Sequence, residues 1–137
     1  MAASNRAGAP PARFDHVGFV VEDLEAAACA FDALLGPPVI RSIPEIGLEA
    51  RVYLGGGVEV LWFAGEVEGI DPRAIRPRPG VHHLAVRVED LDGCLASFGR
   101  DGVGVLQGFP RPGLHGRIAF VEDPVSGGLL ELVEAGA

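Results

Sequence analysis

One stretch of the chain decides how the rest folds, and it reads Gly80-Val81-His82-His83-Leu84-Ala85-Val86-Arg87-Val88-Glu89-Asp90-Leu91. It repeats an earlier stretch, Phe14-Asp15-His16-Val17-Gly18-Phe19-Val20-Val21-Glu22-Asp23-Leu24. His83 follows His16 by 67 positions, and the two Glu-Asp-Leu triplets are separated by the same 67. The chain is therefore a duplicated unit with one histidine in each copy.

Each copy begins as a strand that leads into a helix. Apolar residues alternate around the histidine, which predicts strands at 14–21 and 81–88. An Asp followed by an apolar, Ala-containing run then predicts a helix, capped by Asp23 in one copy and by Asp90 in the other. Three further strands are predicted in each copy, at 39–42, 50–54 and 58–63 and at 103–107, 117–121 and 129–133.

The repeat sets the domain organisation. We expect a flexible N-terminal lead at 1–11, a first βαβββ module at 12–64, a linker at 65–79 with one helical turn at 72–75, and a second βαβββ module at 80–137. The 137 residues are 48% hydrophobic, enough for one shared core. The predicted fold is α+β, with the two tandem modules forming a curved eight-stranded mixed sheet around a metal-binding cleft.

Composition excludes several classes of partner. A net charge of −8 argues against a nucleic-acid backbone, which calls for a basic face. No apolar run approaches the roughly 18 residues of a membrane span, and the first residues lack the apolar segment of a signal peptide. We therefore expect a cytoplasmic protein with no membrane partner.

The last predicted strand of each copy carries one Glu among apolar residues, Glu59 between two valines and Glu131 between two leucines. Alternation puts each Glu on the face opposite to those neighbours. If the copies pair about a pseudo-twofold axis, the two Glu can converge with His16 and His83 in the concavity of the sheet. Two nitrogen and two oxygen donors suit a divalent ion such as Co, Ni, Zn or Mn, with positions open for substrate or water. The alternative is four separate polar residues on half-buried strands.

The repeated module, with His near the start and Glu near the end of each copy, resembles the vicinal oxygen chelate superfamily over about residues 13–134. Within that superfamily the chain is most similar to the methylmalonyl-CoA epimerases. That closer likeness lies in the second copy, in Gly80-Val81-His82-His83-Leu84-Ala85, Pro112-Gly113-Leu114-His115-Gly116-Arg117 and Ser126-Gly127-Gly128-Leu129-Leu130-Glu131-Leu132.

The resemblance implies functional roles for single residues. It implies that Glu45, two residues before Gly47, is an acid that does not touch the metal, and that Glu45 and Glu131 share the proton transfers. Ile46 stands where the family usually has Gln, and the linker lacks the family's helical sequence. The implied metal ligands are His16, Glu59, His83 and Glu131.

Two further histidines are interpreted from their surroundings. His115 and Gly116 are expected in a loop over the substrate, where His115 orders the loop and does not bind metal. Strand alternation predicts that His82 points to the face opposite His83 and is structural.

The implied activity is divalent-metal-dependent epimerisation, in which the α-proton of an acyl-CoA thioester moves through a metal-stabilised enolate. The same four residues fit a glyoxalase I-type isomerase, and a bleomycin-resistance-type binding protein has the same fold without metal or turnover. An extradiol dioxygenase would use two His and one Glu around iron. Because an open curved sheet leaves apolar surface and strand edges to be covered, we also expect a homodimer.

Overall fold

The computed structural model describes residues 12–122 and 128–135, so the predicted lead at 1–11 lies outside the described residues. The first copy forms the predicted βαβββ unit. Two short 3-10 turns, η1 (Pro44–Ile46) and η2 (Leu54–Gly56), connect its last three strands. Its elements are β1 (Ala12–Val20), α1 (Leu24–Leu35), β2 (Val39–Ile43), β3 (Leu48–Tyr53) and β4 (Val58–Phe63).

The second copy follows the same plan after a linker that contains the predicted helical turn, η3 (Pro72–Ile75). Two buried residues of η3, Ala74 and Ile75, belong to the main hydrophobic core, so the linker is part of the packed structure. The elements of this copy are β5 (Gly80–Val88), α2 (Leu91–Arg100), β6 (Arg111–Pro112), β7 (Arg117–Glu122) and β8 (Leu129–Glu134).

The strand predicted at 103–107 is wrong, because the edge strand β6 lies at Arg111–Pro112. Within the predicted segment only Val105 makes a bridge, an isolated one to Val121. The glycines at its two ends, Gly102 and Gly108, have φ angles of 83° and 96°. Extended strands need strongly negative φ, so neither end of the segment can continue as a strand.

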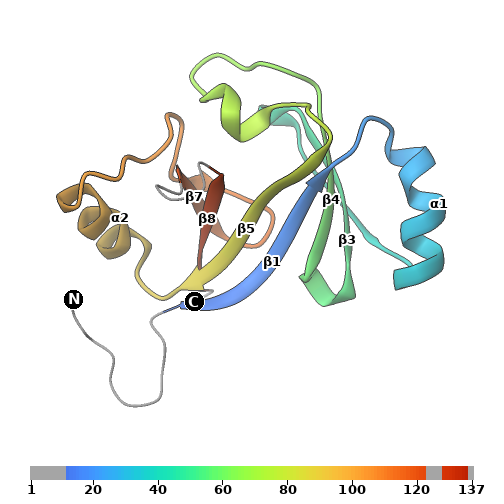
Figure 1. Cartoon of the computed structure of the whole chain (residues 1–137), viewed down its shortest axis with the longest axis horizontal. Coiled ribbons are helices and arrows are strands. Elements are labelled where there is room, and N and C mark those ends of the chain that lie inside the picture. The colour runs from blue at the N-terminus through green and yellow to red at the C-terminus, as the bar shows by residue number, and fades with distance from the viewer. Residues whose placement is uncertain (1–11, 123–127, 136–137) are drawn as a thin grey trace.

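The eight strands form one sheet in the order β2-β3-β4-β1-β5-β8-β7-β6. β1 and β5 pair antiparallel at the centre, and each pairs on its other side with a parallel strand, β4 or β8. The second half of this order mirrors the first, as a pseudo-twofold axis between β1 and β5 requires. Figure 1 shows the curved sheet with α1 and α2 at opposite ends of the molecule. The predicted α+β fold with a curved mixed sheet is confirmed.

The helices begin where the sequence predicts. The Asp23 side chain accepts hydrogen bonds from the backbone N–H groups of Glu25 and Ala26, and Asp90 accepts one from Gly93. These bonds satisfy N–H groups that a helix start leaves free. In the described ranges, no helix is long and apolar enough to cross a membrane.

Candidate metal centre

Four polar side chains are buried at the middle of the sheet, one from each of its four central strands. His16 comes from β1, Glu59 from β4, His83 from β5 and Glu131 from β8. Their exposed fractions are 1%, 3%, 4% and 5%, and apart from Tyr53, whose hydroxyl donates to Asp32, no other polar side chain in the described part of the chain is buried. Buried charges are retained only when they are paired or bind a metal, so this group needs an explanation.

The donor atoms of these four residues meet around His16. Its Nε2 atom lies 3.0 Å from His83 Nε2, 2.9 Å from Glu131 Oε1 and 3.3 Å from Glu59 Oε1. His83 Nε2 lies 3.3 Å from the same Glu131 oxygen. Metal bonds of about 2.0–2.2 Å bring neighbouring donors to within about 3 to 4 Å of each other. Three of the donors, from His16, His83 and Glu131, lie within 4.8 Å of one another and fit one small ion. Glu59 has that mutual spacing with His16 and His115 instead, and it reaches the group through its contact with His16. The structure thus brings all four side chains to His16, and their role as one ligand set stays a prediction.

The chemistry of the donors also fits a divalent cation. Two carboxylates and two neutral imidazoles carry two negative charges, which one dication balances. Glu131 Oε1 is buried and has no hydrogen bond of acceptable geometry among the described residues, although the imidazole nitrogens are close. An ion between the donors would satisfy this oxygen, whose isolation is otherwise costly.

Without metal, the group shares protons as an ion-pair cluster. Burial opposes a charge on His16, but Glu131 and Glu59 outweigh it and raise the pKa of His16 to about 10. Burial likewise opposes the charge on Glu131, and His83 and His16 overcome it and lower the pKa of that carboxyl to about 2. The pKa of Glu59 is also lowered against its burial, first by His115 and then by His16. The carboxylates are thus ionised and ready to bind a cation at neutral pH.

His115 lies at the edge of this cluster, on the loop between β6 and β7. Its Nε2 atom is 2.6 Å from Glu59 Oε2, while the other oxygen of Glu59 lies 3.3 Å from His16 Nε2. Its side chain is 23% exposed, and with His16 and Glu59 it forms a second possible ligand group. Gly116 follows with a φ of 139°, in the region that favours glycine. The loop therefore holds one oxygen of Glu59 while the other faces the centre.

Glu45 lies apart from the four buried residues. It belongs to η1 and its side chain is exposed. The next residue, Ile46, is 4% exposed and lines the pocket in which the donors sit. The remaining apolar walls of this pocket are Ile43, Leu48, Leu61, Leu114, Ile118, Phe120 and Val133.

The predicted orientation of His82 is wrong. Its Nδ1 atom lies 2.7 Å from His83 Nδ1, and its ring packs against Phe63 and Phe120. The β1–β5 register shifts here, so that one more residue stands on β5 than on β1. Such a β-bulge breaks the alternation of side chains on which the prediction rested.

Gly18 is a site residue that the sequence argument missed. It pairs with His83 across the β1–β5 ladder, and a Cβ built on it would lie 2.4 Å from His83 Cε1. The equivalent residue of the second copy, Ala85, pairs with His16. The signal in the sequence is a small residue two positions after each histidine.

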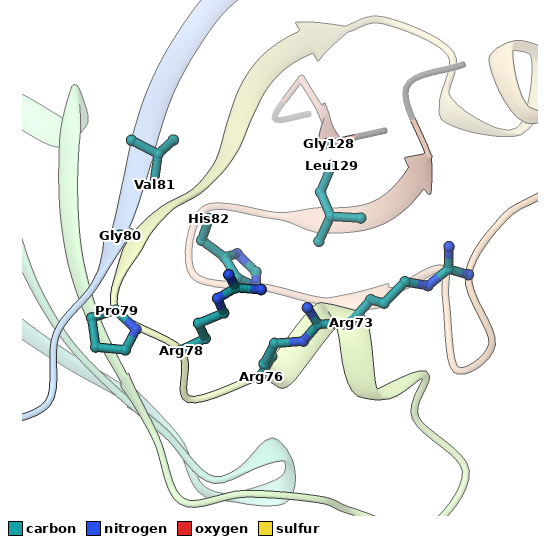
Figure 2. Close-up of a pocket in the computed structure, with 9 residues that line it drawn as sticks. All are labelled: Arg73, Arg76, Arg78, Pro79, Gly80, Val81, His82, Gly128 and Leu129. Atoms are coloured by element: carbon teal, nitrogen blue, oxygen red, sulfur yellow. The ribbon is translucent and has the colours of Figure 1, made fainter. Parts of the chain in front are cut away.

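A second pocket lies beside His82, and Figure 2 shows it between the linker and the starts of β5 and β8. Three arginines of the linker line it, and Arg73 is already paired with Asp71 and Glu122. This is a local basic cluster in a chain whose net charge is −8. The other two arginines are Arg76 and Arg78.

Comparison with known proteins places this geometry in context. Residues 15–120 match the family model of the Glyoxalase/Bleomycin resistance protein/Dioxygenase superfamily. The chain is 28% identical over 137 aligned positions to ethylmalonyl-CoA/methylmalonyl-CoA epimerase of Cereibacter sphaeroides, covering 88% of this chain and 96% of that protein.

Two solved structures are similar over most of the chain. Methylmalonyl-CoA epimerase from Mycobacterium tuberculosis aligns with a TM-score of 0.72 and 28% identity, covering 91% of this chain and 89% of that one. The Streptomyces coelicolor methylmalonyl-CoA epimerase in complex with 2-nitronate-propionyl-CoA aligns with a TM-score of 0.70 and 29% identity, covering 91% and 98%.

Proposed function

The chain belongs to the Glyoxalase/Bleomycin resistance protein/Dioxygenase superfamily, and within it we propose a divalent-metal-dependent epimerase of the methylmalonyl-CoA epimerase type. The observation that carries the proposal is the meeting of two imidazole nitrogens and two carboxylate oxygens in a buried pocket with otherwise apolar walls. The similarity to acyl-CoA epimerases supports a thioester substrate. The proposed ligands are His16, Glu59, His83 and Glu131.

The reaction requires removal of a weakly acidic proton next to a thioester and its return to the opposite face of the carbon. A divalent ion bound at this site, such as Co, Ni, Zn or Mn, would supply a Lewis acid for the negative charge that develops on the substrate oxygen. The apolar walls exclude water, and electrostatic stabilisation is stronger in a dry pocket.

We assign the two proton transfers to Glu45 and Glu131. Glu131 is assigned a transfer because it lies inside the pocket, although its lowered pKa and its place among the ligands make it the weaker base of the two. Glu45 is assigned the other transfer because it is an exposed acid that directly precedes the wall residue Ile46, on the segment that borders the pocket. His115 holds Glu59 from the other side of the pocket and, with Gly116, forms the proposed loop over the substrate.

The test is exchange of the α-proton of methylmalonyl-CoA in deuterated water, with Co²⁺-loaded protein. We expect exchange by the wild type, and a loss of about 10²- to 10⁴-fold in Glu45→Gln, the range for one positioned general base. Bound Co²⁺ should be unchanged in this variant. Glu49→Gln, at an exposed acid on the neighbouring strand β3, is the matched control and should exchange normally.

Each of the other possible outcomes would favour a different function or a different role for Glu45. If the wild type binds Co²⁺ but exchanges no acyl-CoA proton, a glyoxalase I-type isomerase replaces the epimerase. If it binds no metal, a binding protein of the bleomycin-resistance type replaces both. If the wild type exchanges the proton and Glu45→Gln exchanges it equally fast, the metal-dependent chemistry is supported but Glu45 is not the second proton-transfer group.

We further propose that the protein is a homodimer. Three large apolar side chains of the two central strands are exposed: Phe14 (63%), Val81 (71%) and Leu84 (47%). Leu84 stands between the buried residues His83 and Ala85, so it points from the opposite face of the sheet. A second copy of the chain would cover this apolar surface.

A further inference from the structure

We propose that Asp15 and His82 are positioning residues of the metal centre, each holding the outer ring nitrogen of the neighbouring histidine so that the inner nitrogen faces the ion. Asp15 directly precedes His16, and His82 directly precedes His83. The two pairs are 67 positions apart, so Asp15 and His82 occupy equivalent places in the two copies. The proposal rests on the metal site and not on the reaction.

Both residues are placed by the same backbone device. The register of β1 against β5 shifts between Phe14 and His16, which leaves Asp15 as an extra residue on β1. It shifts again between Gly18 and Phe19, which leaves His82 as an extra residue on β5. A bulge turns its extra residue toward the face used by its neighbour, as these contacts show. Each bulge therefore brings a side chain behind a proposed ligand.

In the first copy the partner is a carboxylate. The Nδ1–H group of His16 donates to Asp15 Oδ2 at 2.6 Å. The other oxygen of Asp15 accepts from Arg87, at 2.9 Å from Nε and 2.7 Å from Nη2. Asp15 is held from both sides and fixes the proton of His16 on Nδ1. When an ion displaces the second ring proton, the lone pair of Nε2 is then directed at the centre of the cluster.

In the second copy the partner is an imidazole. The Nδ1 atoms of His82 and His83 are 2.7 Å apart, a distance that admits one shared proton. Because His83 Nε2 faces Glu131 and His16, its own proton belongs on Nδ1 and His82 accepts the bond. The His82 proton is then on Nε2, which is buried beside η3 and has no hydrogen bond of acceptable geometry in the described residues.

Packing keeps His82 in this orientation. Its ring centroid is 5.3 Å from that of Phe63 and 5.8 Å from that of Phe120. In Figure 2 the ring leaves β5 on the side of the linker that carries Arg76 and Arg78. The linker and two aromatic rings thus enclose a residue that contacts a proposed ligand. The two histidine ligands become unequal, because a carboxylate is a stronger acceptor than an imidazole.

The experiment measures Co²⁺ affinity, by competition with a chelator, and the visible absorption spectrum of the Co²⁺-loaded protein. Asp15→Ala and His82→Phe should each weaken binding by about 10- to 100-fold, the usual effect of losing the outer partner of a ligand. His82→Gln, whose amide oxygen can accept the bond from His83, should recover most of the affinity. Leu84→Ala, at the exposed neighbour on the other side of His83, is the control and should change neither affinity nor spectrum.

If Asp15→Ala or His82→Phe does not fold, Asp15→Leu or His82→Leu replaces it, because neither leucine can accept the hydrogen bond and the same loss of affinity is expected. For folded variants, unchanged affinity and an unchanged spectrum in both Asp15→Ala and His82→Phe would overturn the proposal. Equal losses in His82→Phe and His82→Gln would overturn it for His82, because packing alone would then explain the effect. A wild type that binds no Co²⁺ would overturn it entirely.

Discussion

His16 is the centre of the site, and its carboxylate neighbours favour the protonated ring. A proton on this ring therefore competes with the metal ion for the same nitrogen. Glu131 and Glu59 hold the pKa of its ring at about 10 in the metal-free protein, above the ordinary value of 6.5. A metal ligand must be the neutral imidazole, so at neutral pH the ion has to displace this proton.

Metal binding should therefore release about one proton from His16 at pH 7.5, and affinity should rise about tenfold per pH unit toward pH 10. Titration calorimetry with Co²⁺ in buffers of different ionisation enthalpy measures this release. Asp15→Asn keeps the carboxylates Glu59 and Glu131 and should still release the proton. Binding without proton release in the wild type would mean that His16 is neutral before the ion arrives.

The four buried residues could be grouped from the sequence because the duplication marks them twice. One His and one Glu in an unusual strand position are weak signals alone, but the same two residue types on the first and last strands of both copies are specific. Asp15, Gly18 and Arg87 were missed because their roles depend on contacts between copies, which the pattern of one strand does not contain.

Gly18 of β1 faces the ring of the proposed ligand His83 on the paired strand β5. The Cβ of an alanine at Gly18 would lie 2.4 Å from Cε1 and 2.8 Å from Nε2 of His83. Real Cβ atoms do not approach that closely, so the ring would have to move.

Gly18→Ala should consequently weaken Co²⁺ binding by at least about tenfold, the cost expected when a ligand ring is misplaced, while the protein still folds. Chelator competition measures the affinity, and circular dichroism checks the fold. Gly57→Ala is a suitable control, since its Cβ would meet only the Leu54 carbonyl oxygen at 3.6 Å. Equal affinity in Gly18→Ala and wild type would show that His83 is not held against this glycine.

Element types and helix starts followed from local sequence, since periodicity and Asp caps act over a few residues. The incorrect predictions concern features that depend on how strands pair in the folded sheet. The sequence of one strand does not indicate the β-bulge that turns His82, because the bulge depends on pairing with the other strand. The apolar residues at 103–107 are typical of a strand, but the positive φ angles of Gly102 and Gly108 prevent one.

For the whole molecule, the pseudo-twofold pairing of the two modules in one sheet followed from the repeat, whereas the order of strands within each module came only from the structure. The arrangement leaves the outer face of the central strands apolar at Phe14, Val81 and Leu84. The sequence predicted a homodimer but not its geometry, because a sequence does not say which surface a second copy covers.

The proposed homodimer should be visible by sedimentation velocity at micromolar concentration. Val81→Asp and Leu84→Asp should each shift the protein to monomer, because a charge would be buried without a partner in the interface. Leu34→Asp, at an 81% exposed residue of α1, should leave the dimer intact. A monomeric wild type would contradict the proposal, and so would a dimer that both strand variants preserve.

The central claim is that four residues spread over both copies form one metal site. Equilibrium dialysis against Co²⁺, followed by elemental analysis, tests it most directly. We expect one tightly bound ion per chain in the wild type, and loss of that ion in both His83→Ala and Glu131→Ala, since three remaining donors leave the site incomplete. A wild type that retains no ion, or variants that retain it as tightly as the wild type, would show that these residues do not form one metal site.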